Sequence, residues 1–174
     1  MPQPIPPLLL KQNVTLMQKG AYNALLGEAH QYLVTGILMR LGFQVSVITV
    51  RAGTYDLIIS AFVDIDKSLD KTVLVRAQVR TITRSLKFTG GIRGGVDRIY
   101  IPGVKEYKYG PQHNDLIIGV DRDTMDLYFV PNRFITRWGK SVSKNKLQIL
   151  KNNVEILLHW NDEHLNKLEQ SLPK

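Results

Sequence analysis

The stretch Tyr55-Asp56-Leu57-Ile58-Ile59, followed by Leu74-Val75-Arg76-Ala77-Gln78-Val79-Arg80, decides the fold. Both segments predict β-strands, because each is a short apolar run, and isolated polar residues interrupt each run. Successive side chains of a strand point to opposite faces, so Gln78 and Arg80 share one face and Val79 takes the other. An acid on one strand and a polar residue with a cation on its neighbour can converge on one point. That is a layout for holding a divalent metal beside a phosphate.

The segments around these strands predict one mixed α/β domain. A helix is expected over 19–41, where apolar residues recur every three or four positions and Gly42 ends the pattern. Its predicted apolar stripe consists of Tyr22, Leu25, Leu26, Ala29, Leu33, Ile37 and Leu41. Further strands are expected over 43–50, 54–63 and 72–83, a hairpin over 115–120 and 126–130, and a last helix over 161–172. We expect residues 1–15 to form an extended arm and residues 16–174 a single domain with a mixed central sheet flanked by helices.

Positive charge is concentrated in two parts of the chain, whose net formal charge is +8. Residues 76–108 carry eight cations and two acids, and residues 127–154 carry six cations and no acid. Clusters of this kind favour a polyanion such as DNA, because phosphate contacts release counterions. The predicted nucleic-acid contacts are Arg76, Arg84, Lys87, Arg93, Arg98, Lys105 and Lys108. A solvated basic face without a ligand is the alternative.

Composition excludes several classes of protein. The chain has no cysteine, which rules out disulfides, thiolate metal sites and a cysteine nucleophile. No apolar run approaches the ~18 residues of a membrane helix, so we expect no membrane partner and a cytoplasmic location.

The glycine-rich segment 90–95 lies in a long stretch, 86–112, that shows no clear periodicity. It lacks the Gly-Lys-Ser/Thr ending of a Walker loop, so we interpret it as a flexible loop that approaches a nucleic-acid backbone. A plain surface loop is the alternative. Tyr100, Tyr107 and Tyr109 could stack on bases, whereas Trp138 and Trp160 are expected in the core or in subunit contacts.

The order of Glu28 on a helix, Asp56 on a strand, and Gln78 and Arg80 on the next strand resembles the PD-(D/E)XK nuclease superfamily. The resemblance, to small junction resolvases and homing endonucleases, spans about residues 20 to 130. It implies a restriction-endonuclease-like fold and Mg²⁺-dependent hydrolysis of DNA phosphodiesters, with Mn²⁺ as a possible substitute. It implies catalytic roles for Glu28, Asp56, Gln78 and Arg80, with the first three as metal ligands. The chain departs from the family's pattern in two places, because Arg80 stands where lysine is expected and Tyr55 replaces the leading proline.

Other interpretations remain open at this stage. Asp56 could cap a turn, and Glu28 could be an ordinary solvated helix carboxylate. The departures at Gln78 and Arg80 favour a nucleic-acid-binding module on the same fold with weak or no catalysis. An assembly protein with an incidental basic face is a third class. Since cutting two opposite strands usually requires two sites, a homodimer or higher symmetric oligomer is expected.

Overall fold

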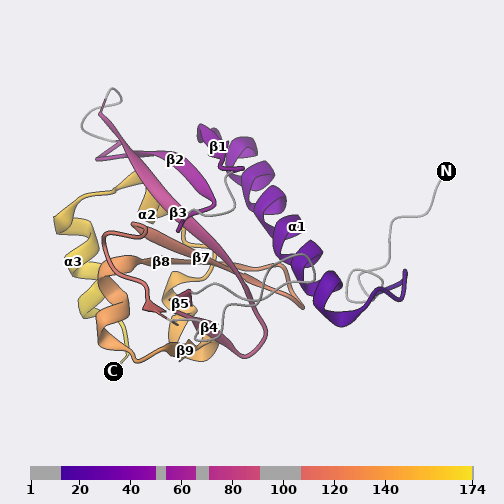
Figure 1. The fold of residues 1–174 in the computed structure, drawn as a ribbon. Helices are drawn as coiled ribbons and strands as arrows, with labels where there is room; N and C mark the ends of the chain where they lie inside the picture. The colour runs from indigo at the N-terminus through magenta and orange to yellow at the C-terminus, as the bar shows by residue number, and fades with distance from the viewer. Residues whose placement is uncertain (1–12, 50–53, 66–70, 91–106, 174) are drawn as a thin grey trace.

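The computed structural model describes residues 13–49, 54–65, 71–90 and 107–173, and its centre is a five-stranded mixed sheet (Figure 1). The strands lie in the order β1 (Val45–Val47), β2 (Leu57–Phe62), β3 (Thr72–Ile82), β7 (Leu116–Asp121) and β8 (Leu127–Pro131). Neighbouring strands are antiparallel except β3 and β7, which are parallel. Strand β7 is buried along its whole length, as its run of apolar residues requires at the interior of a sheet.

Helix α1 (Lys19–Arg40) lies along one side of the sheet, and α2 and α3 lie on the other side of the molecule (Figure 1). The residues that α1 buries are His30, Val34 and Leu38. The buried face of α1 is therefore rotated about the helix axis relative to the predicted stripe. Of the stripe, Leu25 and Ala29 are exposed, and Leu33 and Ile37 are only partly buried. The helix carries apolar residues nearly all round, so periodicity alone did not select its buried face.

The ends of two helices follow known capping patterns. After α1, Gly42 has φ 93°, its N–H donates to the Met39 carbonyl, and the Phe43 N–H donates to the Leu38 carbonyl. These bonds form a Schellman motif, which confirms Gly42 as the end of the helix. Helix α3 (Asp162–Gln170) is capped by Asn161, whose side chain accepts from the His164 N–H at 2.9 Å.

Two small two-stranded ribbons are separate from the main sheet, and the sequence did not reveal them. Strand β4 (Ser85–Lys87) pairs with β9 (Ser141–Ser143), and β5 (Thr89–Gly90) pairs with β6 (Tyr107–Lys108). Each strand is two or three residues long, which is too short for a period-2 pattern to be recognised. Of the stretch 86–112 that contains the glycine-rich segment, residues 91–106 lie outside the described part of the chain.

The C-terminal third packs short helices against the sheet. They are η2 (Asn132–Arg137), η3 (Lys144–Leu150), α2 (Glu155–Leu158) and α3, with the first two in 3₁₀ geometry. Trp138 is buried and its ring stacks on Phe88 with centroids 5.8 Å apart, so it belongs to the core. Among the described residues, no helix has the length and hydropathy to cross a bilayer. Residues 1–12 of the predicted arm lie outside the described part.

Candidate active site

Asp56 and Gln78 meet at the edge where β2 begins. Leu57 pairs with Ala77, so Asp56 lies one step further along the same register and faces Gln78. The Gln78 amide Nε2 donates a hydrogen bond to Asp56 Oδ2, and the backbone N–H of Val79 donates to the same oxygen at 2.8 Å. No hydrogen bond from a described residue reaches the other carboxylate oxygen, Oδ1. Within the described part of the chain, the protein thus fixes Asp56 through Oδ2 alone.

Burial controls the charge of this carboxyl group. The pKa of Asp56 is raised above its ordinary value because the group is desolvated, although the Val79 N–H and the positive charge of Arg80 oppose that shift. Gln78 is also buried, with a relative exposure of 7%. A carboxylate in such an environment is stabilised by nearby positive charge, and Arg80 supplies one.

Arg80 lies two residues beyond Gln78 on the same face of β3. Its guanidinium stacks over the ring of Tyr109 at 5.2 Å, and one terminal nitrogen donates to the carbonyl of Thr89 at 3.3 Å. Tyr109 is buried, so it supports Arg80 and is not open to stack on a base. These contacts hold a permanent positive charge close to Asp56.

Glu28 does not join this group. The His30 ring contacts the Thr81 hydroxyl at 2.8 Å, so α1 packs on the face of β3 that carries Val79 and Thr81. Gln78 and Arg80 alternate with these residues and point to the opposite face. Glu28 is exposed, and no hydrogen bond or ion pair among the described residues links it to Asp56 or Gln78. The structure thus brings together three of the four residues implied by the resemblance.

Two predicted nucleic-acid contacts have internal partners. Arg76 forms an ion pair with Asp115 at 2.8 Å and also donates to the carbonyls of Pro111 and Gln112. Burial alone would raise the pKa of Asp115, but the hydrogen bonds and charge of Arg76 bring it below its ordinary value. The Lys108 ammonium donates to the carbonyls of Ile135 and Trp138. Both cations therefore have partners within the fold, and their contact with a nucleic acid stays a prediction.

Arg84 and Lys87 remain exposed, and among the described residues neither forms an ion pair. The other predicted contacts, Arg93, Arg98 and Lys105, lie outside the described part of the chain.

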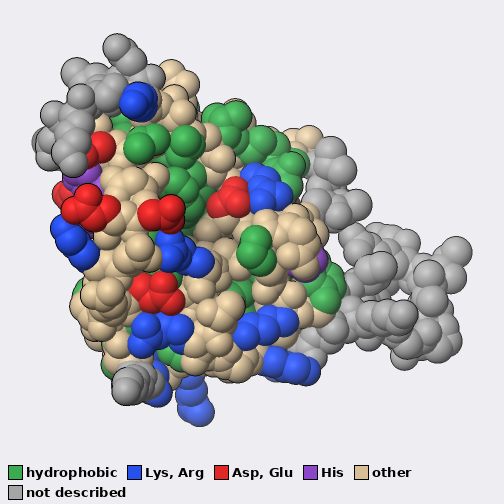
Figure 2. All heavy atoms as spheres, turned by 90° about the vertical axis from the view of Figure 1, so that its left-hand side faces the viewer, with side chains coloured by type: hydrophobic (Ala, Val, Ile, Leu, Met, Phe, Trp, Pro, Cys, Tyr) green, Lys and Arg blue, Asp and Glu red, His purple; other side chains and the backbone are tan. Residues whose placement is uncertain are grey.

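In the second basic cluster, 127–154, three of the six cations are paired with acids that lie outside the cluster. Its ion pairs join Arg133 to Asp162 and Glu169, Lys144 to Asp121, and Lys151 to Asp126. Figure 2 shows acidic side chains interspersed with basic ones over much of one face. Arg137 donates to the carbonyls of Glu169 and Leu172 at the end of α3. The sequence count overstated this cluster because its acids come from other segments.

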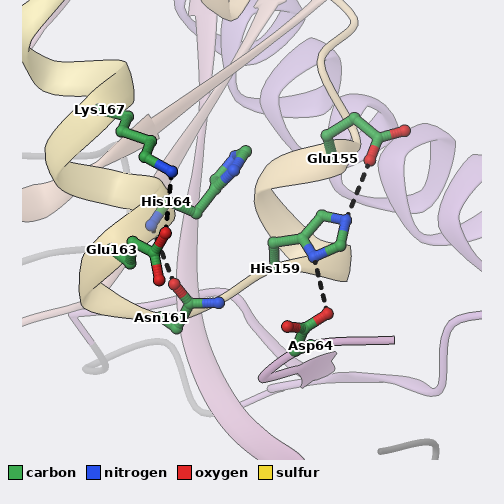
Figure 3. Close-up of a pocket in the computed structure, with 7 residues that line it drawn as sticks. All are labelled: Asp64, Glu155, His159, Asn161, Glu163, His164 and Lys167. Carbon is green, nitrogen blue, oxygen red and sulfur yellow. Dashed lines mark hydrogen bonds and ion pairs between the residues drawn. The ribbon is translucent and has the colours of Figure 1, made fainter. Parts of the chain in front are cut away.

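A polar pocket of about 290 Å³ lies where α2 and α3 meet the end of β2 (Figure 3). His159 stands between Asp64 and Glu155, at 3.3 and 3.4 Å, and its ring lies 5.4 Å from that of His164. Among the described residues, no three His, Asp or Glu side chains are placed to hold a metal. Asn161 in the same turn donates to the Val63 carbonyl, so this cluster joins the C-terminal helices to β2.

The contacts that hold the Arg80 side chain in place were not predicted from the sequence. The carbonyl of Thr89 and the ring of Tyr109 come from β5 and from the residue after β6, whose pairing was not expected. Tyr109 was noticed, but as a candidate for base stacking. Its apolar neighbours in the fold bury it, and no local pattern encodes that burial.

Comparison with known proteins supports the fold. No protein-family model matches the chain, and no curated protein matches it in sequence. A solved structure, that of the bacterial homing endonuclease I-Ssp6803I, aligns with a TM-score of 0.58 at 13% identity, covering 81% of this chain and 95% of the other. The chain therefore has a restriction-endonuclease-like α/β fold, shared with that protein, which confirms the predicted fold class.

Proposed function

We propose that this protein is a metal-dependent DNA endonuclease. The observation that carries the proposal is the contact of Asp56 with Gln78 beside the fixed charge of Arg80, on a fold shared with a homing endonuclease. A carboxylate, an amide and a guanidinium on one face can accommodate a cation and a phosphate together.

The residues present fit a magnesium ion. Mg²⁺ prefers oxygen ligands and usually keeps several waters, with one or two carboxylates and the substrate phosphate completing its shell. Asp56 would hold it through its carboxylate, and Gln78 through its amide oxygen after the amide turns over. Glu28 is not included in this set, because α1 packs on the face of β3 opposite to Gln78 and Arg80. When bound, the ion would activate water and neutralise charge on the scissile phosphate.

The chain's own residues orient the substrate. Arg80 presents several N–H donors and would bind the phosphate oxygens, while Tyr109 and the Thr89 carbonyl hold its side chain in place. The Val79 N–H and the Gln78 amide fix the Asp56 carboxylate. In the reaction, water adds to phosphorus and the bond to the leaving sugar oxygen breaks, with the proton passing to that oxygen or to solvent.

The direct test is cleavage of supercoiled plasmid and of linear and branched duplexes by the purified chain. We expect nicked or linear products with Mg²⁺ or Mn²⁺ and none after chelation by EDTA. Failure to cut any of these substrates with either ion would contradict the proposal.

A nucleic-acid-binding module is the second candidate, and a specific observation favours it. Glu28 stands apart from the other three residues, which leaves one ionised carboxylate at the site. Salt-sensitive DNA binding without cleavage would identify this alternative.

The nucleic-acid surface is proposed to include the β4–β9 ribbon. Leu86 of β4 packs against the sheet at Gly119. A side chain added at Gly119 would collide with Ile82 and come close to Leu86. Gly119 pairs with Arg80, so the ribbon covers the sheet face that carries Arg80. On the ribbon's outer side Ser85 lies opposite Ser143, and Lys87 lies opposite Ser141. Hydroxyl groups and cations on a two-stranded ribbon suit contact with phosphates, and such a ribbon fits the major groove.

Removing two exposed cations of this ribbon should weaken DNA binding in a salt-dependent way. The double variant Arg84→Ala/Lys87→Ala is expected to reduce the slope of log affinity against log salt by about 2, since each phosphate contact contributes ~0.9. Fluorescence anisotropy over a salt series measures this slope. The control Arg40→Ala/Lys167→Ala removes the same charge from exposed positions elsewhere. Equal slopes for both variants would place the binding surface outside the ribbon.

A further inference from the structure

Helix α1 exposes an apolar stripe on the side turned away from the sheet. Leu25, Tyr32 and Met39 are 51, 59 and 57% exposed, and Ala29 and Gly36 lie between them. The five residues follow a 4-3-4-3 spacing, so at 100° per residue they fall within about 80° of the helix circumference. This is the spacing by which one helix packs along another.

The stripe is nearly palindromic. Leu25 and Met39 are both seven residues from Tyr32, and Ala29 and Gly36 are three and four residues from it. A symmetric two-fold contact requires a surface that is complementary to itself. If two copies of α1 pack antiparallel about Tyr32, each Leu25 meets Met39 of the second copy and each Ala29 lies near Gly36 of the second copy.

Gly36 provides a separate observation. A Cβ added there would have no heavy atom within 4 Å, as also at Gly20 and Gly27 of the same helix, so no neighbour in the described part of the chain demands a glycine. Glycine within a helix costs about 1 kcal/mol relative to alanine. Close approach of a second helix backbone would account for a small residue at this position.

The charges next to the stripe allow this arrangement. Glu28 flanks the stripe, and the antiparallel register places it near Thr35 and Gly36 of the second copy. Two Glu28 carboxylates would be separated by about 12 Å along the axis, so they repel little.

We propose that this stripe is the surface through which two copies of the chain associate, as an antiparallel pair of α1 helices centred on Tyr32. The proposal is independent of catalysis, so a chain that does not cut DNA would still form the pair. One helix pair buries less than the ~800 Å² per partner of a standard interface. The dimer should therefore be reversible, with a dissociation constant on the order of 10 µM.

Sedimentation equilibrium from about 1 to about 200 µM tests the association. Tyr32→Glu should raise the dissociation constant at least tenfold, because it places two carboxylates together at the two-fold axis. Leu74→Glu is the matched control, since Leu74 is 72% exposed on β3 and lies off the stripe. A wild type that remains monomeric, or an equal effect of the two substitutions, would overturn the proposal. Circular dichroism melting shows that each variant is folded.

Disulfide trapping tests the register, and the absence of cysteine from the chain makes each introduced thiol unique. Tyr32→Cys alone should form a covalent dimer on mild oxidation. A mixture of Leu25→Cys and Met39→Cys chains should cross-link, whereas each of these variants alone should not. Cross-linking of each variant alone, without gain in the mixture, would indicate a parallel pair and overturn the antiparallel arrangement.

Discussion

Asp56→Asn should abolish metal-dependent cleavage while leaving the chain folded and able to bind DNA. We expect a loss of at least about 10³-fold in cleavage rate, because the only carboxylate seen at the candidate site among the described residues would no longer hold a cation. Asparagine keeps the shape and an oxygen that can accept from Gln78 and Val79. Cleavage rates and DNA affinity in EDTA should be measured together. Asp123→Asn, which neutralises an exposed acid in the β7–β8 turn, is the control.

The same substitution should raise stability at neutral pH. Burial raises the folded-state pKa of Asp56, so its contribution to stability is present below the unfolded pKa and is lost as pH rises through the folded pKa. The ionised form of Asp56 is therefore the less favourable one in the fold, and the uncharged Asn of Asp56→Asn should increase the free energy of unfolding at neutral pH in urea titrations. Lower stability with full cleavage activity would contradict both parts of the prediction.

Arg80→Lys should reduce both DNA binding and cleavage. Lysine keeps the charge, but it loses the flat stacking on Tyr109 and the fork that would bind two phosphate oxygens. We expect about a tenfold loss in affinity and about a hundredfold loss in cleavage rate, with a larger loss of cleavage for Arg80→Ala. Binding by anisotropy and single-turnover cleavage separate the two effects.

Arg84→Lys is the control for Arg80→Lys, because Arg84 is exposed and keeps its charge in the same exchange. It should leave both binding and cleavage nearly unchanged. Activity of Arg80→Lys equal to or above that of the wild type would instead indicate that arginine replaced a catalytic lysine with some loss of function.

Local patterns determined much of the fold. The apolar runs predicted β2 and β3, and alternation along β3 placed Gln78 and Arg80 on one face. The structure confirms the contact of Gln78 with Asp56 that these patterns implied. The hairpin of β7 and β8 and the last helix were also predicted correctly, because each depends on residues close together in sequence.

Three features depend on the tertiary structure: the face of α1 that is buried, the cations that have partners within the fold, and the pairing of the small ribbons. With apolar residues around the whole of α1, its orientation depends on packing against the sheet, and that packing exposes Glu28 and the Leu25–Met39 stripe. Arg76 is neutralised by Asp115, 39 residues away, and Ser85 pairs with Ser143 across a longer separation. Side-chain periodicity is a local property, so the sequence predicted the main strands, the first and last helices and the Asp56–Gln78 pair. Long-range packing decided which charges remain available, because partners distant in sequence leave no local pattern.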